Sequence, residues 1–266
     1  MVRTRKGSRG IGSATGVSAC AAAMTLAGLT FAPAARASDV HDLQRNLPLE
    51  VEDTTATEEG SLQVQASARY ERTHDGEDQL TVEPQLQYGL VPNVHVELSY
   101  PIIAGDADRT GSGDVTAAVF YNFLQEENAR PALAVKAQVD LPTGVGSDGV
   151  DTDLRFLLTK TLTENESQDR MHLNVDWIHN AAADNDERQN RFIGVVGYSR
   201  KLSDQTVFLA DLVREQQDQE GLDSTILEAG LLHQLNDKIT LAAGIGAGLG
   251  EDSPDVRLTI GVQYSF

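Results

Sequence analysis

Apolar and polar residues alternate along most of the chain from Gly60 onward. The last eleven residues, VRLTIGVQYSF, show the pattern without a break, with apolar side chains at every second position from Val256 to Phe266. A period of two predicts strands that are apolar on one face and polar on the other. The pattern recurs in twelve stretches: residues 61–72, 79–89, 93–102, 114–123, 132–141, 153–162, 170–180, 191–200, 206–215, 224–234, 238–248 and 255–266.

The predicted strands are long, and the connections between them alternate in length. Most strands have about ten residues, close to the roughly 9–11 that a tilted strand needs to cross a bilayer, whereas soluble strands average roughly five or six. Short joins such as LVPN and LND alternate with long ones such as AGDADRTGSG and AAADNDERQN. This layout predicts an all-β fold, a transmembrane antiparallel up-and-down β-barrel of about 12 strands whose last strand pairs with its first.

The aromatic residues support a membrane location. Of the thirteen that follow residue 37, eleven take the apolar parity, and most of these lie near a strand end, as in the aromatic girdles of outer-membrane barrels. A secreted β-sandwich or a soluble barrel is the alternative, because both also alternate apolar and polar residues. One strand leaves its register open, since Asp211 shares a face with Val207 and Leu209.

The first 37 residues differ in composition from the rest. Four basic residues precede a small and apolar run, which ends at Ala35-Arg36-Ala37, the small-x-small pattern that signal peptidase cleaves. We therefore predict a cleaved signal peptide at 1–37, an acidic and loosely packed extension at 38–59, and an outer-membrane β-barrel at 60–266. Both termini of the mature chain are then expected to face the periplasm.

The charge balance narrows the possible partners. The chain carries a formal charge of −19 at pH 7, and loss of the basic signal makes the remainder more negative. This excess argues against nucleic acid, because phosphates select basic surfaces. The long loops are acidic, and such a rim would concentrate cations, bridge through divalent cations to lipopolysaccharide, or simply be solvated. The only cysteine, Cys20, lies in the predicted signal, so no disulfide is expected after cleavage.

The polar parity of the strands carries charges of both signs. In a barrel these positions face the lumen, and twelve strands leave more internal space than eight. The charges would select solutes in a solvated or partly filled lumen, or they would pair with one another and brace the wall. The candidate lumen-lining residues are Arg69, Glu83, His95, Glu97, Asp114, Lys136, Arg155, His172, Asp176 and Arg257.

The stretch 238–248 departs from this pattern, because glycine occupies its inward positions. Gly244, Gly246 and Gly248 remove side chains from the lumen wall and let other groups approach the backbone. They predict a lumen groove for a solute or for the N-terminal extension. Wall curvature is the alternative explanation.

No catalytic or cofactor site is predicted. His95 and Ser99 share a face but lie four residues apart, too far for a direct hydrogen bond at roughly 3.4 Å per residue. His172, His179 and His233 have no serine partner by spacing. No His, Cys or Asp cluster has zinc-ligand spacing, and no phosphate-binding loop is present. We therefore expect no enzyme activity, no metal and no cofactor.

Several segments resemble one known family. LPLEVEDTTATEEGSLQVQASARYER, YGLVPNVHVELSYPI, GSGDVTAAVFYNFL, ALAVKAQVDLPTG and the terminal strand are similar to the bacterial outer-membrane family labelled as the putative MetA-pathway of phenol degradation. Many members of that family are called transporter-like. The resemblance covers about residues 47–266. It implies a β-barrel and the passage of small, aromatic or hydrophobic compounds, and it assigns no binding residue.

These observations together predict an outer-membrane channel or uptake protein for small molecules. The alternative is a barrel that transports nothing and serves envelope structure or surface interaction. We expect a monomer in contact with outer-membrane lipid and lipopolysaccharide, with a small molecule as its solute. The aromatic residues Tyr264 and Phe266 also resemble the signal read by the barrel-assembly machinery, which would be a further partner.

Overall fold

The computed structural model describes residues 41–106, 110–145, 147–163 and 166–266, so the predicted signal peptide lies outside the described residues. None of the described residues forms a helix long and apolar enough to span a membrane. The strands are β1 (Leu62–Arg72), β2 (Asp78–Val91), β3 (Val94–Ser99), β4 (Ile102–Gly105), β5 (Gly111–Ser112), β6 (Val115–Leu124), β7 (Ala132–Leu141), β8 (Asp151–Thr161), β9 (Arg170–His179), β10 (Asn190–Ser203), β11 (Thr206–Gln216), β12 (Asp223–Asn236), β13 (Ile239–Gly248) and β14 (Val256–Ser265).

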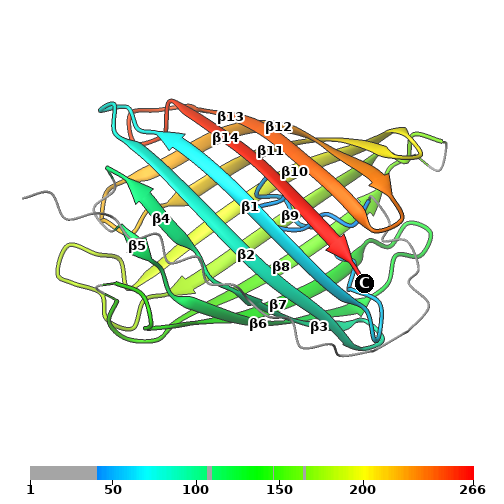
Figure 1. The fold of residues 1–266 in the computed structure, drawn as a ribbon, viewed down its shortest axis with the longest axis horizontal. Helices are drawn as coiled ribbons and strands as arrows, with labels where there is room; N and C mark the ends of the chain where they lie inside the picture. The colour runs from blue at the N-terminus through cyan, green and yellow to red at the C-terminus, as the bar shows by residue number, and fades with distance from the viewer. Residues whose placement is uncertain (1–40, 107–109, 146, 164–165) are drawn as a thin grey trace, which may run out of the picture. The chain divides into compact units, whose positions relative to one another are not determined.

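The strands close into one antiparallel barrel (Figure 1). β1 pairs with β14 along one edge and with β2 along the other, so neither end of the sheet is left free. The short strands belong to two interrupted crossings, because β3 and β4 both pair with β2, and β5 precedes β6 along the next crossing. The barrel therefore has 12 crossings, which confirms the predicted fold class and strand number.

The interruption has a local cause. Pro101, between β3 and β4, has no N–H to give to a ladder. Gly113 lies opposite it and donates its N–H to Pro101 O at 2.8 Å. A Cβ at Gly113 would lie 2.7 Å from Pro101 Cγ, so glycine lets the two crossings stay in contact here.

The two ends of the barrel differ in their connections. At one end the turns after β2, β10 and β12 are short, and Phe266 lies there (Figure 1); we call it the terminus end. At the other, which we call the loop end, the connections after β7, β9, β11 and β13 are longer than these turns, although those after β6 and β8 at the terminus end are also longer than the connection after β11. The sequence predicted this contrast for these joins.

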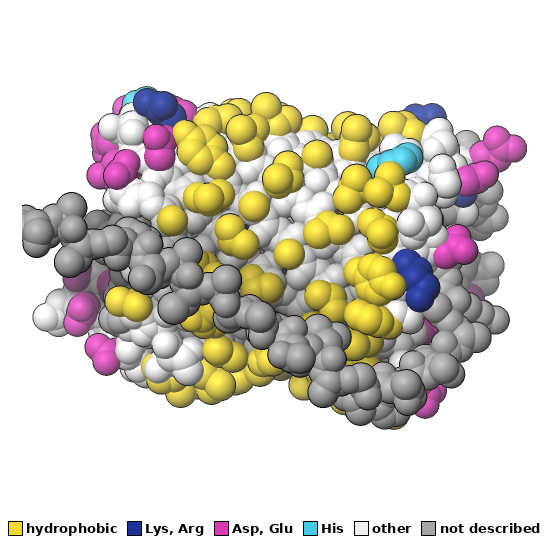
Figure 2. All heavy atoms as spheres, viewed as in Figure 1, with side chains coloured by type: hydrophobic (Ala, Val, Ile, Leu, Met, Phe, Trp, Pro, Cys, Tyr) yellow, Lys and Arg dark blue, Asp and Glu magenta, His cyan; other side chains and the backbone are white. Residues whose placement is uncertain are grey.

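The outer face of the wall is apolar. Ile260, Ile245 and Leu227 are 65%, 57% and 53% exposed, and many other large apolar side chains accompany them. Figure 2 shows hydrophobic side chains spread over the wall, with acidic and basic side chains at its two ends. Such a surface is suited to lipid rather than water.

One strand carries apolar side chains on its inner face. Val207, Leu209, Asp211 and Val213 of β11 are all at most 2% exposed, whereas Leu212 is 42% exposed. The register that the sequence left open is therefore settled, with Asp211 and its apolar neighbours inside the barrel. The inside of the barrel is apolar here because another part of the chain packs against it.

Residues 41–57, which we call the inserted segment, lie inside the barrel (blue in Figure 1). Leu43, Leu49 and Val51 are each 1% exposed. The prediction of a loosely packed extension is therefore wrong for residues 41–54, every one of which is buried or half-buried. The acidic composition of the segment suggested loose packing, because the segment has no apolar core of its own. The barrel wall buries its side chains instead.

Candidate functional site in the barrel lumen

The inserted segment folds back on itself inside the lumen. At its tip Asn46 N donates to Leu49 O at 2.8 Å, and Asp53 N donates to Leu43 O at 3.1 Å between its two arms. Other backbone groups of the segment bond to side chains of the wall. The wall therefore helps to fix the conformation of the segment.

Apolar side chains of the segment pack against the inner faces of β9 to β13. The cluster of buried residues that they form with the wall is Leu43, Leu47, Leu49, Val51, Ile178, Ile193, Val195, Val207, Leu209, Val213, Ile226, Leu232 and Ala242. This contact explains why β11 places apolar residues beside Asp211 in the lumen. It is non-directional and depends on matched shape.

Wall glycines make room for the same side chains. A Cβ at Gly197 would lie 2.3 Å from Val51 Cγ2, and one at Gly261 would lie 2.3 Å from Leu47 Cδ1. Carbon atoms do not approach so closely, so any other residue here would displace the segment or the wall.

Only one of the three predicted groove glycines borders the inserted segment. A Cβ at Gly244 would lie 2.8 Å from Leu49 Cδ2. Gly246 instead faces the Glu228 side chain, and Gly248 faces the loop that follows β13. The three glycines therefore adjoin three different groups.

Buried charges hold the other side of the segment. Lys136 Nζ lies 2.7 Å from Glu52 Oε1, and Arg155 Nε lies 3.2 Å from Glu52 Oε2. Arg69 Nη1 lies 2.6 Å from Glu50 Oε1. Three predicted lumen residues thus neutralise two carboxylates of the segment, which the sequence did not anticipate as their partners.

Polar side chains of the wall bond the backbone of the segment. Asn174 Oδ1 accepts a hydrogen bond from Glu52 N at 2.9 Å, and Asn174 Nδ2 donates to Glu52 O at 2.8 Å. Asp211 Oδ2 accepts from Val51 N at 2.8 Å. These bonds satisfy backbone groups that would otherwise be buried without partners.

His95 and Glu97 join β3 to this network. His95 is fully buried, and its Nδ1 accepts from Thr57 N at 3.0 Å. Its Nε2 lies 2.9 Å from Glu97 Oε1, and Glu97 Oε2 lies 3.4 Å from Lys136 Nζ. Two further predicted lumen residues are therefore linked to the inserted segment, one directly and one through Lys136.

Arg45 is the cation of the segment, and it pairs with carboxylates on two wall strands. Its Nη1 lies 3.2 Å from Asp153 Oδ2, and its Nη2 lies 3.6 Å from Asp176 Oδ2. Its Nε lies 3.2 Å from Glu50 Oε2. Asp176 also lies 3.1 Å from Arg155 Nη1, so this predicted residue contacts both a wall cation and the segment.

The remaining acidic and basic lumen candidates make different contacts. Arg257 Nε lies 2.7 Å from Glu71 Oε1 within the wall, and Arg257 Nη1 lies 3.9 Å from Glu50 Oε1 of the inserted segment. Glu83 Oε2 accepts from Asn46 Nδ2 of the segment at 3.2 Å. Asp114 Oδ1 accepts backbone N–H groups of the loop after β7 at 2.8 and 3.0 Å.

His172 has a serine partner that sequence spacing did not reveal. Its Nε2 lies 3.0 Å from Ser199 Oγ on β10, and its Nδ1 lies 3.0 Å from Thr159 Oγ1. The prediction that it lacks a serine partner is therefore wrong, because strand pairing joins residues far apart in sequence. All three side chains are at most 5% exposed, and the third member is a hydroxyl rather than a carboxylate, so we interpret the arrangement as a buried hydrogen-bond chain.

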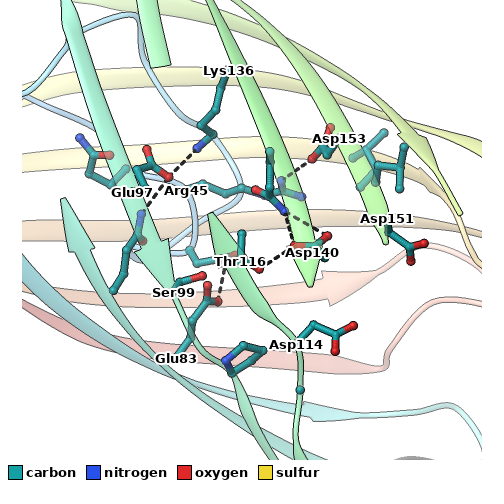
Figure 3. A pocket seen from close by; sticks show the side chains of 18 of the residues that line it. Arg45, Glu83, Glu97, Ser99, Asp114, Thr116, Lys136, Asp140, Asp151 and Asp153 are labelled. Carbon is teal, nitrogen blue, oxygen red and sulfur yellow. Dashed lines mark hydrogen bonds and ion pairs between the residues drawn. The ribbon is translucent and has the colours of Figure 1, made fainter. Parts of the chain in front are cut away.

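A cavity of about 400 Å³ lies beside the tip of the inserted segment, toward the loop end (Figure 3). Seven of its lining side chains are carboxylates and three are basic. Of the predicted lumen residues, Glu83, Glu97, Asp114 and Lys136 line it. Within the described ranges, no three His, Cys, Asp or Glu side chains are placed to hold a metal ion.

Several residues of this network were not predicted from the sequence. Asp153 and Asn174 share the inward parity of Arg155 and His172, so their direction could have been predicted. Their partners could not, because Glu50 and Glu52 belong to a segment that was expected to pack loosely.

Tyr264 and Phe266 form an edge-to-face pair, with ring centroids 4.8 Å apart. Lys238 Nζ lies 5.8 Å from the centre of the Tyr264 ring. Phe266 is 41% exposed at the terminus end. Their role in recognition by the assembly machinery stays a prediction.

The family follows from the sequence match. The family model described as "Putative MetA-pathway of phenol degradation" matches residues 46–266. The chain belongs to this family. The match confirms the resemblance seen in the sequence, and it includes the tip of the inserted segment as well as the barrel. No curated protein resembles the chain closely enough to count as a match.

Solved structures of outer-membrane channels and porins share the fold. An outer membrane channel from Pseudomonas putida F1 superposes with a TM-score of 0.63 at 16% identity, over 80% of this chain and 98% of that chain. The NanC porin gives 0.56 at 13% identity, over 76% and 98%. The KdgM porin gives 0.51 at 9% identity, over 76% and 99%. At these identities the likeness concerns the fold, and this family member is an outer-membrane β-barrel.

Proposed function

We propose that the protein is an outer-membrane channel through which small solutes pass passively. The observation that supports this most is the cavity of about 400 Å³ inside the barrel, beside the tip of the inserted segment. Its volume suits a small molecule, and its charged lining suits one that arrives in water. The channel and porin structures that share the fold agree with this function.

The side chains that line the cavity indicate which class of solute would fit. Pro101, Ile103, Ile178 and Ile193 adjoin the charged side chains in the cavity. A solute with both a polar group and a small apolar part would therefore fit. Passage of a phenol or another aromatic or hydrophobic compound, which the family description implies, stays a prediction.

We also infer that the terminus end faces the periplasm and the loop end faces the outside. Long external loops and short periplasmic turns are the usual arrangement of bacterial barrels. Single cysteines at Asp186 in a long loop and at Asp237 in a short turn test the orientation. A membrane-impermeant maleimide should label D186C, and not D237C, on intact cells; the reverse pattern would contradict this orientation. A monomeric state and contact with lipopolysaccharide also stay predictions.

A barrel without transport is the second candidate, and one observation favours it. The inserted segment fills the lumen toward the terminus end, where Gln87, His95 and Asn122 of the wall are at most 5% exposed. Buried side chains leave little space for a solute. Passage would then require the inserted segment to shift.

Conductance separates the two candidates. Purified protein in planar lipid bilayers should give discrete current steps that favour cations, because the cavity carries more carboxylates than bases. Liposome swelling with phenol and with a small sugar then compares the two solute classes. Heat-modifiable gel mobility confirms that the inserted protein is folded. Folded protein that inserts into the bilayer without current steps would contradict the channel proposal and favour the non-transporting barrel.

A further inference from the structure

The cavity beside the inserted segment has an excess of negative charge that the chain does not neutralise. Its three basic side chains are all in ion pairs: Arg45 with Glu50, Asp153 and Asp176, Lys136 with Glu52 and Glu97, and Arg191 with Glu215 and Asp218. Four of its seven carboxylates form no ion pair with any described residue: Glu83, Asp114, Asp140 and Asp151. An ion that enters this space is therefore favoured if it is a cation.

A guanidinium already occupies one position in this cavity. Arg45 belongs to the inserted segment, and its Nη1 atom lies 3.2 Å from Asp153 Oδ2, which lines the cavity (Figure 3). Its Nη2 atom lies 3.6 Å from Asp176 Oδ2 on the neighbouring strand. A planar guanidinium matches paired carboxylates because its N–H groups form a rigid fork. Arg45 thus shows, within the chain itself, which chemical group these two carboxylates accept.

The two wall carboxylates have further capacity to accept hydrogen bonds. Asp153 is 5% exposed and Asp176 is fully buried. The Oδ1 atom of each accepts no hydrogen bond from the described residues. A buried carboxylate oxygen without a donor is a strong site for a charged N–H group.

The rest of the lining fits the remainder of a small cation. Asp140, with Thr116 and Gln138 as its hydrogen-bond partners, lies close to the position of Arg45 (Figure 3). Ile178 and Ile193 add an apolar surface. A short alkyl chain attached to a guanidinium would therefore contact carboxylates at one end and isoleucine at the other.

We propose that the cavity binds small organic cations bearing a guanidinium group at Asp153, the wall carboxylate that lines the cavity and that Arg45 contacts. Such a cation competes with Arg45 for this carboxylate. Binding therefore loosens one charged contact that holds the inserted segment against β8. The proposal rests on the proposed channel function for its physiological meaning, but the binding itself is measured without transport.

The test measures equilibrium binding of propylguanidinium to purified full-length protein in detergent, with calorimetry as the method. Propylurea, which is neutral and similar in shape, and propylammonium are compared with it. We expect propylguanidinium to bind in preference to both. The variant Asp153→Asn should weaken its binding about tenfold by removing a charged acceptor, whereas Asp237→Asn in an exposed turn should not.

Two arginine variants show whether Arg45 is a competitor. Arg45→Gln should tighten propylguanidinium binding about tenfold, because it removes the internal guanidinium. Arg191→Gln removes one positive charge from the same cavity without freeing Asp153, and it should change the affinity much less. Heat-modifiable mobility is measured on each variant to show that it is folded.

Several outcomes would overturn the proposal. They are no binding of propylguanidinium to wild type and Arg45→Gln, equal binding of propylurea or propylammonium, or equal effects of the two arginine variants. Each is independent of conductance. Binding of propylguanidinium without any current would contradict the channel function and support this site. Current without binding would support the channel function and contradict this site.

Discussion

The inserted segment is held by two unlike parts of the lumen wall. Along β9 to β13 it meets apolar side chains, and glycines such as Gly197 and Gly244 leave room for it. Along β7 to β9 it meets Lys136, Arg155 and Asn174, which bond its carboxylates and its backbone. One contact is made by shape and the other by charge.

The two contacts differ in what a single change does to them. An apolar contact has no direction, and the neighbouring groups can shift to relieve part of the strain when volume is added. A buried ion pair fails when one partner is removed, since the other charge stays buried without compensation. Removal of a charge on the charged side should therefore have a larger effect than addition of volume on the apolar side.

The largest effect is expected from Arg155→Met. Arg155 is 1% exposed and lies within 3.2 Å of both Glu52 and Asp176. Its loss leaves two buried carboxylates short of a cation, which costs about 3–5 kcal/mol when a buried pair is broken. Urea unfolding of the detergent-solubilised barrel should show lower stability, and trypsin should cleave the inserted segment faster.

Arg130→Met is the matched control for that prediction. Arg130 pairs with Glu127 at 2.6 Å, but both side chains are more than half exposed. Exposed pairs contribute about 0–1 kcal/mol. Equal losses of stability in the two variants would show that burial does not distinguish these pairs.

A smaller effect is expected from Gly197→Val. The new Cβ would lie 2.3 Å from Val51 Cγ2, and overpacking of this kind costs about 1–3 kcal/mol. Because the inserted segment yields more easily than the closed wall, we expect it to shift and the bilayer conductance to rise. Gly194→Val is the control on the same strand, since no atom lies within 4 Å of a Cβ there. An unchanged conductance in Gly197→Val would mean that the wall gives way instead.

The sequence predicted the wall better than what fills it. Strand periodicity repeats at every second residue, so the twelve crossings and the inward direction of Arg155 follow from local pattern alone. Asp211 beside Leu209 looked inconsistent because a lumen was assumed to be polar throughout. The exception is explained only by Leu49 and Val51, which come from another part of the chain.

The glycines of 238–248 offered a groove for the N-terminal extension as one hypothesis, and Gly244 does border it. The close packing of the segment could not be predicted, because the wall residues that bury it are distant in sequence. Glu50 and Glu52 add to an acidic composition that is typical of solvated extensions. Their cations, Arg69, Lys136 and Arg155, lie on separate strands. The pairing of Ser199 with His172 failed to be predicted for the same reason, because it depends on strand register rather than spacing.

The smallest effect on the inserted segment is expected from a change of pH. This prediction compares two carboxylates of the segment, Glu50 and Asp53. Burial opposes ionisation of Glu50, but Arg69 and Arg45 beside it hold its pKa well below the usual value. Burial raises the pKa of Asp53 from 3.8 to about 6, which Thr55 and Arg170 only partly offset. Since Asp53 prefers its protonated form when buried, its contribution to holding the segment is present at low pH and is lost as pH rises through about 6.

Hydrogen exchange of residues 41–57, corrected for the intrinsic effect of pH, measures this contribution. Protection should be up to roughly tenfold greater at pH 5 than at pH 7.5. Asp53→Asn, which cannot ionise, should remove that difference. Glu50→Gln should leave it in place, because the pKa of Glu50 lies below the range tested. Protection that instead rises with pH in wild type would assign the dominant titration to a group other than Asp53. The distinction between Glu50, which has a cation at 2.6 Å, and Asp53, whose cation Arg170 lies 3.9 Å away, would then fail.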